Sequence, residues 1–409
     1  MKIALVTQYF WPETFSINDL VKSLVDQGHS VEVFTGKPNY PEGQVFDGYS
    51  PEGATTEIFY NSVPVHRAPL RPRGAGGAKN LVLNYLSFVY NGLKHFPRQA
   101  QGKDFDVILV FTLSPITSVI PAIYLKWRLK THLAIWVLDL WPESLRATGF
   151  IKNRAVLGLV GCMVRIIYGC SDTILVQSRA FIAAVSRYTK RDKVFYYPNS
   201  HVDVPRFASD VTTVPGDVLQ LMDENFCLVF TGNLGTAQAL PTIIAAADQL
   251  RSLHDFRLVL VGSGSMSGWL QQQKQDLGLD NVILAGRYPA VEMPQFLVRA
   301  SGLLVSLTAA EIFSQTVPAK IQSYLAAGRP IIASLNGEGA AVVLEARAGI
   351  SCPAEDVDAL VAAIKHLYDL PVTERQSLGR RGRDYFLKHF ETNAQAAALV
   401  DVLQQRIAK

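Results

Sequence analysis

The sequence has few cysteines and no apolar run long enough to cross a bilayer. None of the four cysteines lies in a CxxC pair or near a Cys/His cluster, which favours buried, reduced thiols of a cytosolic protein. The most apolar segments, residues 81–93, 116–125 and 155–168, are shorter than the roughly 20 residues of a transmembrane helix. No signal peptide is visible, because the chain leads directly into a strand pattern. We expect a cytoplasmic protein that can touch the inner face of a membrane.

Acidic residues are scarce in one long segment. Residues 58–138 contain ten Lys or Arg but only two acids, Asp104 and Asp106, in a chain whose net charge is +4. This asymmetry predicts an anionic partner, although a solvated basic face would give the same composition. Anionic lipid fits better than nucleic acid, because the cations alternate with aliphatic and aromatic runs and no nucleic-acid-binding motif is present.

Residues suited to a metal ion are also lacking. Asp104 and Asp106, like Asp356 and Asp358, have the spacing of an Asp-x-Asp metal motif. The first pair is expected to precede a strand and the second to cap a helix. The sequence therefore predicts neither a metal nor another cofactor.

Strand and helix patterns alternate in two series along the 409 residues, which is enough chain for about two or three domains. The strand patterns of the first series are residues 2–7, 30–35, 107–111, 133–138 and 173–176. Those of the second are residues 226–231, 256–261, 282–284, 303–307 and 330–333. Such alternation predicts α/β domains with parallel, doubly wound sheets. The Pro/Gly-rich residues 36–78 are predicted to form one long loop.

The two series imply two Rossmann-like domains facing a central cleft. We expect the first at residues 1–200, a linker at 201–218 and the second at 219–385. A C-terminal helix at 386–409 follows the completed second series, so it can return to the first domain.

Glycine-rich turns follow the first two strands of the second series. They contain Gly232, Asn233 and Gly235 in one case and Gly262 in the other. Ligands of open α/β sheets bind beyond the carboxyl ends of the strands, where glycines let a phosphate approach the backbone. Each turn alone could equally be an ordinary tight connection.

A helix start near residue 318 carries the strongest local signal. Ser314 or Thr316 is the predicted cap, Pro318 lies in the first turn, and Lys320 follows it. A cation in a first turn opposes the helix dipole, so a bound anion is a natural partner. Free N–H groups and a lysine together suit a diphosphate, although a solvent-facing Lys320 remains the alternative.

Aromatic residues and carboxylates follow two strands of the first series. Trp11 and Glu13 come after the first strand, and Asp139, Trp141 and Glu143 after a later one. Aromatic faces beside carboxylates suit a polyhydroxylated sugar. A helix-capping acid beside a core tryptophan is the alternative for either motif alone.

These motifs resemble those of glycosyltransferase family 4, the retaining enzymes with the GT-B fold. The resemblance covers nearly the whole chain and is closest to the O-antigen and capsule subgroup that includes N-acetyl-L-fucosaminyltransferases. It rests on residues 28–31, 198–199, 232–235, 261–264, 286–287, 317–320 and 324–330, with 139–144 and 336–340 for the subgroup.

The resemblance implies a C-terminal domain that holds a nucleotide diphosphate, an N-terminal domain that holds the acceptor, and no metal. Catalytic roles are expected for Asp139, Lys320 and Arg287. Donor contacts are expected at Gly232, Asn233, Gly235, Gly262, Arg287, Ser314, Thr316, Val317, Lys320, Glu338 and Glu345. Acceptor contacts are expected at Trp11, Glu13, Arg71, Arg73, Asp139 and Glu143. The expected partners are a UDP-sugar and a polyprenyl-diphosphate-linked sugar.

The chain departs from the family pattern at the ribose contact. Many members carry two Glu seven residues apart, where this chain has Gln315 and Ser323. Glu338 or Glu345 would have to replace the second one. Two rival functions stay open: a non-hydrolysing UDP-sugar 2-epimerase, because its fold is similar, and a non-catalytic sugar-nucleotide-binding subunit, because the two Glu are missing.

A predicted helix at residues 80–96 is rich in Leu, Val, Tyr and Phe, and Arg71, Arg73 and Lys79 precede it. Such a segment can lie in the headgroup region of an anionic membrane. Packing inside the first domain is the alternative for the same helix.

Overall fold

The computed structural model describes residues 1–74, 77–147, 151, 153–203 and 212–408. The chain forms two compact units, one made of Met1–Ser200 with Thr392–Lys409 and the other of His201–Glu391. Of the expected linker, residues 204–211 lie outside the described residues. Its last residues belong to a helix, since α7 (Gly216–Glu224) begins at Gly216.

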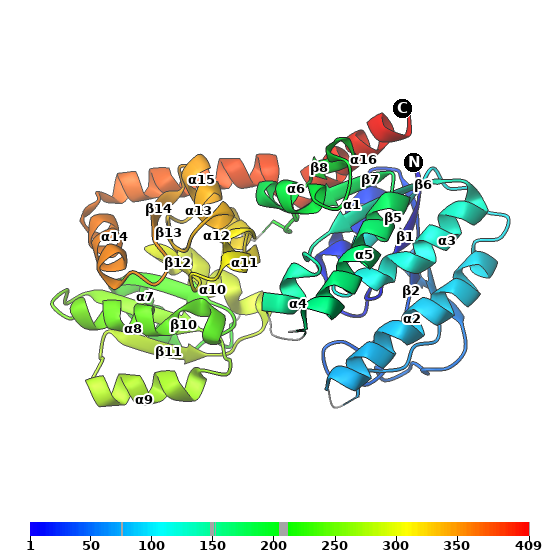
Figure 1. The fold of residues 1–409 in the computed structure, drawn as a ribbon. Helices are drawn as coiled ribbons and strands as arrows, with labels where there is room; N and C mark the ends of the chain where they lie inside the picture. The colour runs from blue at the N-terminus through cyan, green and yellow to red at the C-terminus, as the bar shows by residue number, and fades with distance from the viewer. Residues whose placement is uncertain (75–76, 148–150, 152, 204–211, 409) are drawn as a thin grey trace. The chain divides into compact units, whose positions relative to one another are not determined.

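The first unit is built on an eight-stranded sheet (Figure 1). All neighbouring strands are parallel except the antiparallel pair β3–β4. The order across the sheet is β3 (Thr55–Phe59), β4 (Val63–Arg67), β2 (Ser30–Thr35), β1 (Lys2–Val6), β5 (Val107–Thr112), β6 (His132–Val137), β7 (Thr173–Val176) and β8 (Val194–Tyr196).

The prediction of one long loop at residues 36–78 was wrong, because β3 and β4 lie within it. The apolar signal of β3 is weak, because it is an edge strand with mostly exposed side chains. Pro64 inside β4 argues against a strand when only the sequence is known. In the structure Pro64 faces Ile58 of β3 in the antiparallel ladder.

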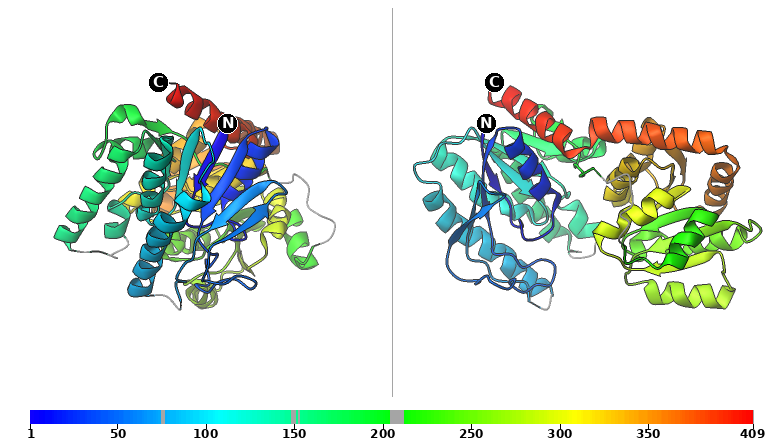
Figure 2. Two further views of the ribbon diagram at one scale, coloured as in Figure 1. Left: turned by 90° about the vertical axis from the view of Figure 1, so that its right-hand side faces the viewer. Right: turned by 180° about the vertical axis from the view of Figure 1, so that it is seen from behind.

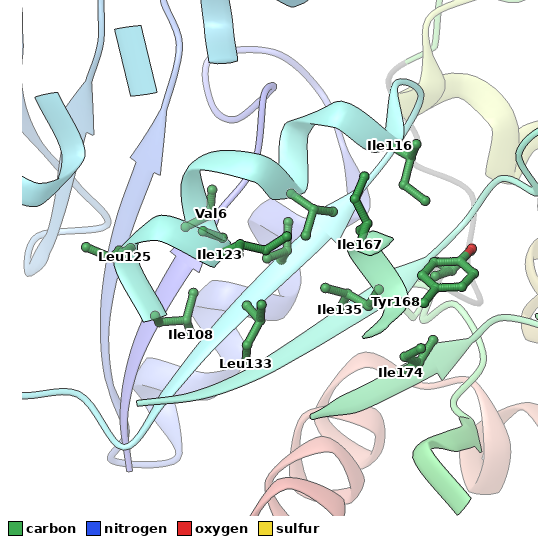
Figure 3. Close-up of a cluster of buried hydrophobic side chains, with 14 of the residues drawn as sticks. Val6, Ile108, Ile116, Ile123, Leu125, Leu133, Ile135, Ile167, Tyr168 and Ile174 are labelled. Carbon is green, nitrogen blue, oxygen red and sulfur yellow. The ribbon is translucent and has the colours of Figure 1, made fainter. Parts of the chain in front are cut away.

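Helices cover both faces of this sheet. One face carries α2 (Ala78–Gln99), η1 (Ile116–Val119), α3 (Ile120–Leu129), α5 (Arg154–Cys170) and α6 (Arg179–Ser186). Figure 3 shows the apolar core beneath them, where Ile123, Leu125 and Ile167 point toward strand residues such as Ile108 and Ile135. The other face carries α1 (Ser16–Asp26) and α16 (Thr392–Ile407), which lie side by side in the rear view of Figure 2. The remaining short helices are α4 (Glu143–Ala147) and η2 (Arg191–Lys193).

The C-terminal helix α16 belongs to the first unit by its packing. Leu399 and Leu403 are fully buried in the core that α1 also joins. The Tyr197 hydroxyl donates to the Gln395 carbonyl at 2.9 Å. The preceding helix α15 (Val372–His389) runs through the expected boundary at residue 386, and the chain enters the first unit at Thr392.

The second unit contains a six-stranded, fully parallel sheet. Its order is β11 (Val282–Gly286), β10 (Phe256–Val261), β9 (Phe226–Thr231), β12 (Gly302–Ser306), β13 (Ile331–Ser334) and β14 (Gly349–Cys352). One face packs against α7, α10 (Met293–Arg299), α12 (Ala319–Ala327), α13 (Glu338–Glu345) and α15. The other packs against α8 (Leu240–Gln249), α9 (Ser267–Leu277) and α14 (Val357–Asp369). The short helices are η3 (Thr236–Gln238), η4 (Ala290–Glu292) and α11 (Glu311–Ser314).

The predicted fold class is therefore confirmed: two Rossmann-like α/β units, each with helices on both faces of a mostly parallel sheet. The predicted cap of α12 was wrong, because the helix begins at Ala319 and Pro318 is its N-cap. The predicted cap of α14 was right, since the Asp356 carboxylate accepts from the Ala359 N–H at 2.9 Å.

Candidate functional site

The carboxyl ends of β9, β10 and β11 are joined by their glycine turns in the second unit. The Gly232 N–H donates to the Val261 carbonyl at 2.8 Å, and the Gly262 N–H to the Gly286 carbonyl at 2.7 Å. Gly262 has a φ of +147°, and a Cβ there would lie 1.8 Å from the Gly232 carbonyl oxygen. Only glycine fits so close an approach. The two turns thus form one continuous backbone surface.

A pocket of about 470 Å³ opens on this surface. Its lining residues are Gly232, Asn233, Val261, Gly262, Ser263, Gly264, Arg287, Tyr288 and Met293. Arg287, which directly follows β11, is exposed there, and no carboxylate among the described residues pairs with it. The pocket therefore combines glycines, which let a ligand approach the backbone closely, with a guanidinium that has no carboxylate partner among the described residues.

Lys320 lies against the same turns in the first turn of α12. Its Cε would be 2.9 Å, and its Nζ 3.5 Å, from a Cβ placed on Gly232. Burial lowers the pKa of Lys320 to about 7. No acidic side chain among the described residues offsets that burial. A poorly solvated, uncompensated amine is well suited to bind an anion.

The first glycine turn offers fewer backbone donors than the sequence predicts. The N–H groups of Gly232 and Leu234 are bonded to the neighbouring turn, and that of Gly235 donates to the Gln238 side chain at 3.0 Å. Asn233 alone in this turn keeps an N–H with no acceptor among the described residues. Among the described residues, the Asn233 N–H is therefore the donor of this turn that stays available to a ligand, whereas the Gly235 N–H serves the turn itself.

The side chains of the segment before α12 bond or pack within the second unit. The Ser314 hydroxyl donates to the Glu311 carbonyl at 2.7 Å and that of Thr316 to the Phe313 carbonyl at 3.3 Å. The side chain of Val317 is buried in the core. These residues shape the segment with their side chains, so contact with a ligand would have to come from their backbone.

The two candidate ribose ligands lie at opposite ends of α13. Glu338 begins the helix, and Gly337 before it packs tightly on the Ser314 carbonyl, which places Glu338 beside the segment that precedes Lys320. Glu345 ends the same helix and is exposed. Because the helix starts at the carboxyl edge of the sheet and runs away from it, Glu338 is the better placed of the two.

In the first unit, polar side chains follow successive strands and bond to one another. Ser114, after β5, donates its hydroxyl to the Asp139 carboxylate, after β6, and accepts from the Trp141 indole N–H at 3.0 Å. Gln177, after β7, donates to the Leu138 carbonyl at 2.6 Å. Asp139 therefore has a fixed position at the carboxyl edge of the sheet. Ser114 was not predicted as a site residue, although its place shortly after a strand pattern was a usable signal.

Asp139 and Trp141 border a second pocket, also of about 470 Å³. Most of its wall is apolar. It is lined by Leu81, Val82, Tyr85, Leu86, Ser114, Thr117, Asp139, Trp141, Ser144, Leu145 and Ile151.

Arg73 lies beside this pocket within a group of tyrosines. Its guanidinium carbon is 5.0 Å from the centre of the Tyr9 ring, 5.1 Å from that of Tyr40 and 6.0 Å from that of Tyr85, which also lines the pocket. It donates to the Tyr9 hydroxyl, while its buried Nε has no acceptor among the described residues. Arg71 is exposed and bonds through its backbone to α2.

The other candidate acceptor residues do not line this pocket. Glu13 is buried, and its carboxylate accepts backbone N–H groups of Asn39, Tyr40 and Phe10 at 2.8–3.1 Å. Burial raises the pKa of Glu13 to about 7, against the lowering effect of these bonds. This carboxylate holds a loop and does not cap the following helix, whose N-cap is Phe15. Trp11 packs on Phe59 with ring centres 5.6 Å apart, and Glu143 accepts the Tyr188 hydroxyl at 3.2 Å.

The described parts of the chain contain neither a metal-binding cluster nor a membrane-spanning helix. No group of three or more His, Cys, Asp or Glu side chains there could hold a metal ion. None of the helices described is both long and apolar enough to span a bilayer.

Known proteins share both the family patterns and the fold. A model described as "Glycosyl transferase 4-like domain" matches residues 15–200, and one described as "Glycosyl transferases group 1" matches residues 225–369. Sucrose-phosphate synthase from Thermosynechococcus elongatus has a TM-score of 0.73 at 17% identity over 100% of this chain and 99% of its own. The chain is a glycosyltransferase of the GT-B type. The family models support the resemblance to family 4.

Relatives of this glycosyltransferase include a protein of polysaccharide synthesis. The "putative colanic acid biosynthesis glycosyl transferase WcaI" of Escherichia coli is 26% identical over 394 residues, which are 91% of this chain and 93% of the relative. HepE from Anabaena, crystallised in complex with UDP, has a TM-score of 0.68 at 12% identity, over 99% of this chain and 100% of its own.

Proposed function

We propose that this glycosyltransferase transfers a sugar from a UDP-sugar to a polyprenyl-diphosphate-linked sugar, with retention at the anomeric carbon. The product would be a repeat unit of a surface polysaccharide such as O-antigen or capsule. The transferred group would be an N-acetylated deoxyamino sugar or another hexose, as in N-acetyl-L-fucosaminyltransferases. The colanic acid synthesis named for WcaI and the UDP bound by HepE support this class of donor and product.

The observation that carries the proposal is the pair of uncompensated cations at the glycine turns. Lys320 and Arg287 lie at the same strand ends, and no carboxylate among the described residues neutralises either one. Transfer breaks the bond between the sugar and the diphosphate, so negative charge grows on the leaving oxygen. Preorganised cations and the Asn233 N–H would stabilise that charge most where water is excluded.

Metal-independent transfer is part of the proposal, because the two cations can supply the positive charge that a divalent ion supplies in other transferases. Asp139 would contact the acceptor or the reacting sugar, since the Ser114 hydroxyl fixes its carboxylate at the carboxyl edge of the first sheet. Glu338 would contact the ribose in place of the glutamate that Ser323 replaces.

We further propose that the enzyme works at the cytoplasmic face of the membrane. The helices α2, α3 and α5 lie side by side on one face of the first sheet (Figure 1). They contain no acidic residue but carry Lys79, Lys94, Arg98, Lys126, Arg128, Arg154 and Arg165. Their outer surface also exposes apolar side chains, including Leu86 (56%), Leu159 (71%) and Ile166 (66%). Apolar groups among cations with no acid suit an anionic lipid surface.

A panel of nucleotide sugars, each incubated with and without a lipid-linked acceptor, tests the proposed function. A glycosyltransferase consumes the donor and extends the acceptor only when both are present. A 2-epimerase converts the donor without any acceptor, and a binding subunit binds UDP without turnover. Analysis of the product linkage by NMR then decides between retention and inversion.

A further inference from the structure

The apolar pocket of the first unit is not explained by sugar binding. Its polar members are Asp139, Ser114, Thr117 and Ser144, and of these Ser114 bonds to Asp139 and to the Trp141 indole at one side. The rest of the wall is mostly aliphatic, including Leu81, Val82 and Leu145. A sugar needs many hydrogen-bonding partners, whereas this wall offers chiefly van der Waals contact. The volume of about 470 Å³ is within the roughly 300–1,000 Å³ typical of small-molecule sites.

The unpaired cation beside the pocket indicates what kind of apolar ligand would fit. Arg73 is bordered by tyrosine rings, no acid among the described residues pairs with it, and its Nε lacks an acceptor. Tyr85 lies between Arg73 and the pocket, because its ring contacts the guanidinium and also lines the cavity. A buried donor without a partner is costly unless a ligand satisfies it. An apolar cavity next to such a cation suits a molecule with an anionic head and a hydrocarbon tail.

We infer that this pocket binds the first isoprenyl units of a prenyl diphosphate, with Arg73 contacting the phosphates. The inference rests on the proposed lipid-linked acceptor and assigns a site to its lipid portion. In this arrangement the prenyl diphosphate anchors the acceptor, and the sugar that it carries lies toward Asp139.

The outer wall of the pocket leads onto the exposed surface of α2. Val82 and Leu86 line the pocket and are themselves 44% and 56% exposed, and Tyr90 continues the same helical stripe. Residues four apart lie on one face of a helix, so these three form a continuous apolar path. The remainder of a long prenyl chain can follow this path out of the pocket toward the acid-free surface of α2, α3 and α5.

Calorimetric binding of farnesyl diphosphate to the full chain tests the inference without donor, membrane or turnover. Farnesol and inorganic pyrophosphate report the separate contributions of tail and head. The wild-type protein should bind farnesyl diphosphate at least about tenfold more tightly than either fragment, because both contacts act together. Equal affinity for farnesyl diphosphate and pyrophosphate would show that the pocket contributes nothing and would overturn the inference, as would absence of farnesyl diphosphate binding.

Two variants of α2 locate the site. Val82→Trp fills the pocket, whereas Tyr90→Trp introduces the same side chain on the same stripe outside the pocket lining. Val82→Trp should weaken farnesyl diphosphate binding about tenfold or more, since the buried tail loses most of its apolar contact. Tyr90→Trp should leave it unchanged. Equal effects of the two variants would place the tail elsewhere and reject the pocket.

Arg73→Gln separates the head from the tail. It should weaken binding of farnesyl diphosphate and pyrophosphate but leave farnesol binding unchanged, and an unchanged diphosphate affinity would reject Arg73 as the contact. UDP binding to the same samples reports on the second unit. Absence of farnesyl diphosphate binding by the wild type, with intact UDP binding, would reject this inference alone, whereas absence of UDP binding by the wild type would count against the proposed function.

Discussion

The Nζ of Lys320 lies 3.5 Å from the centre of the Phe230 ring, directly beneath the turn that begins at Gly232. The ring face attracts the ammonium form but cannot neutralise it. The amine is therefore positioned before any ligand binds, between the Phe230 ring and the turn at Gly232. Such a group has little to reorganise when negative charge develops nearby.

Replacement of Lys320 by methionine should abolish most of the transfer activity while the fold survives. Methionine keeps the length and apolar stem of the side chain but removes the charge. Loss of one preorganised contact to the leaving group should lower kcat by about 100-fold or more. Steady-state kinetics measures the loss of turnover, and circular dichroism checks that the fold is kept. Wild-type-like turnover by Lys320→Met would remove this residue from the reaction.

The pH dependence of two quantities should reveal the same amine. The pKa of Lys320 falls from its ordinary 10.5 to about 7 in the folded protein, so between these pH values the unfolded chain binds more protons. The thermal stability of the ligand-free protein should therefore gain a contribution as the pH rises from 7 toward 10. UDP binding should show the opposite trend above pH 7, because the diphosphate needs the protonated amine.

Lys320→Met is the control for this dependence. It should be more stable than the wild type at pH 7, by a few degrees in Tm, because a buried cation no longer has to be desolvated. At pH 7 the variant should bind UDP more weakly than the wild type does. Above pH 7 its UDP affinity should not fall further through this residue, because it has no amine to deprotonate. Identical pH profiles of the variant and the wild type would show that Lys320 does not titrate near pH 7.

The fold and the meeting of the glycine turns were largely predictable from the sequence for a physical reason. Parallel strands are short apolar runs, and their carboxyl ends meet at one edge, so turns such as those at Gly232 and Gly262 must lie together. Which N–H groups remain available could not be predicted, because the bond of Gly235 to Gln238 depends on the exact path of the turn.

The first unit shows where prediction from sequence stops. The apolar pocket is assembled from α2, η1 and the segment after β6, and no local pattern shows that Leu81 and Leu145 share a cavity. The burial of Glu13 depends on a loop that folds back from Asn39. An acid after a strand is equally compatible with a ligand contact and with such a structural role.

Glu13→Ala should therefore act on stability. The substitution leaves three backbone N–H groups without their acceptor, which should cost on the order of 1–3 kcal/mol of unfolding free energy. Glu143→Ala, at a partly exposed carboxylate of the same unit, is the matched comparison and should cost less. Urea denaturation measures both. A Glu13→Ala protein with unchanged stability and a raised KM for the acceptor would restore Glu13 to the acceptor site.

Transfer should continue after removal of divalent metal ions. Lys320 and Arg287 supply positive charge at the glycine turns, and no cluster of metal-binding side chains is present among the described residues. Activity should be unchanged after dialysis against EDTA. Loss of activity that Mg²⁺ or Mn²⁺ restores would show that a metal ion, with ligands partly from the substrate, also supplies positive charge to the leaving group.

The acid-free surface of α2, α3 and α5 should bind anionic vesicles. Changing Lys79, Lys94 and Arg128 together to Glu reverses three exposed charges on this surface, each worth roughly 1 kcal/mol near an anionic membrane. Changing Lys365, Lys388 and Arg380 to Glu reverses as many exposed charges on α14 and α15 of the second unit and is the matched control. In co-sedimentation with phosphatidylglycerol vesicles, only the first variant should be released, and both should keep nearly the wild-type Tm.

The same pair of variants separates membrane attachment from catalysis. The first should lower transfer to an acceptor embedded in vesicles far more than transfer to a short, water-soluble acceptor, because only the former requires the enzyme to reach the bilayer. Arg73 is left unchanged in this design, since its guanidinium lies among Tyr9, Tyr40 and Tyr85 and its replacement would disturb the pocket as well. Raised salt should mimic the charge reversal by screening the surface over a Debye length of about 10 Å at 0.1 M and less at higher concentration. Vesicle binding that is indifferent to salt and equal in both variants would assign the membrane contact to another surface, while the transfer reaction itself would be unaffected.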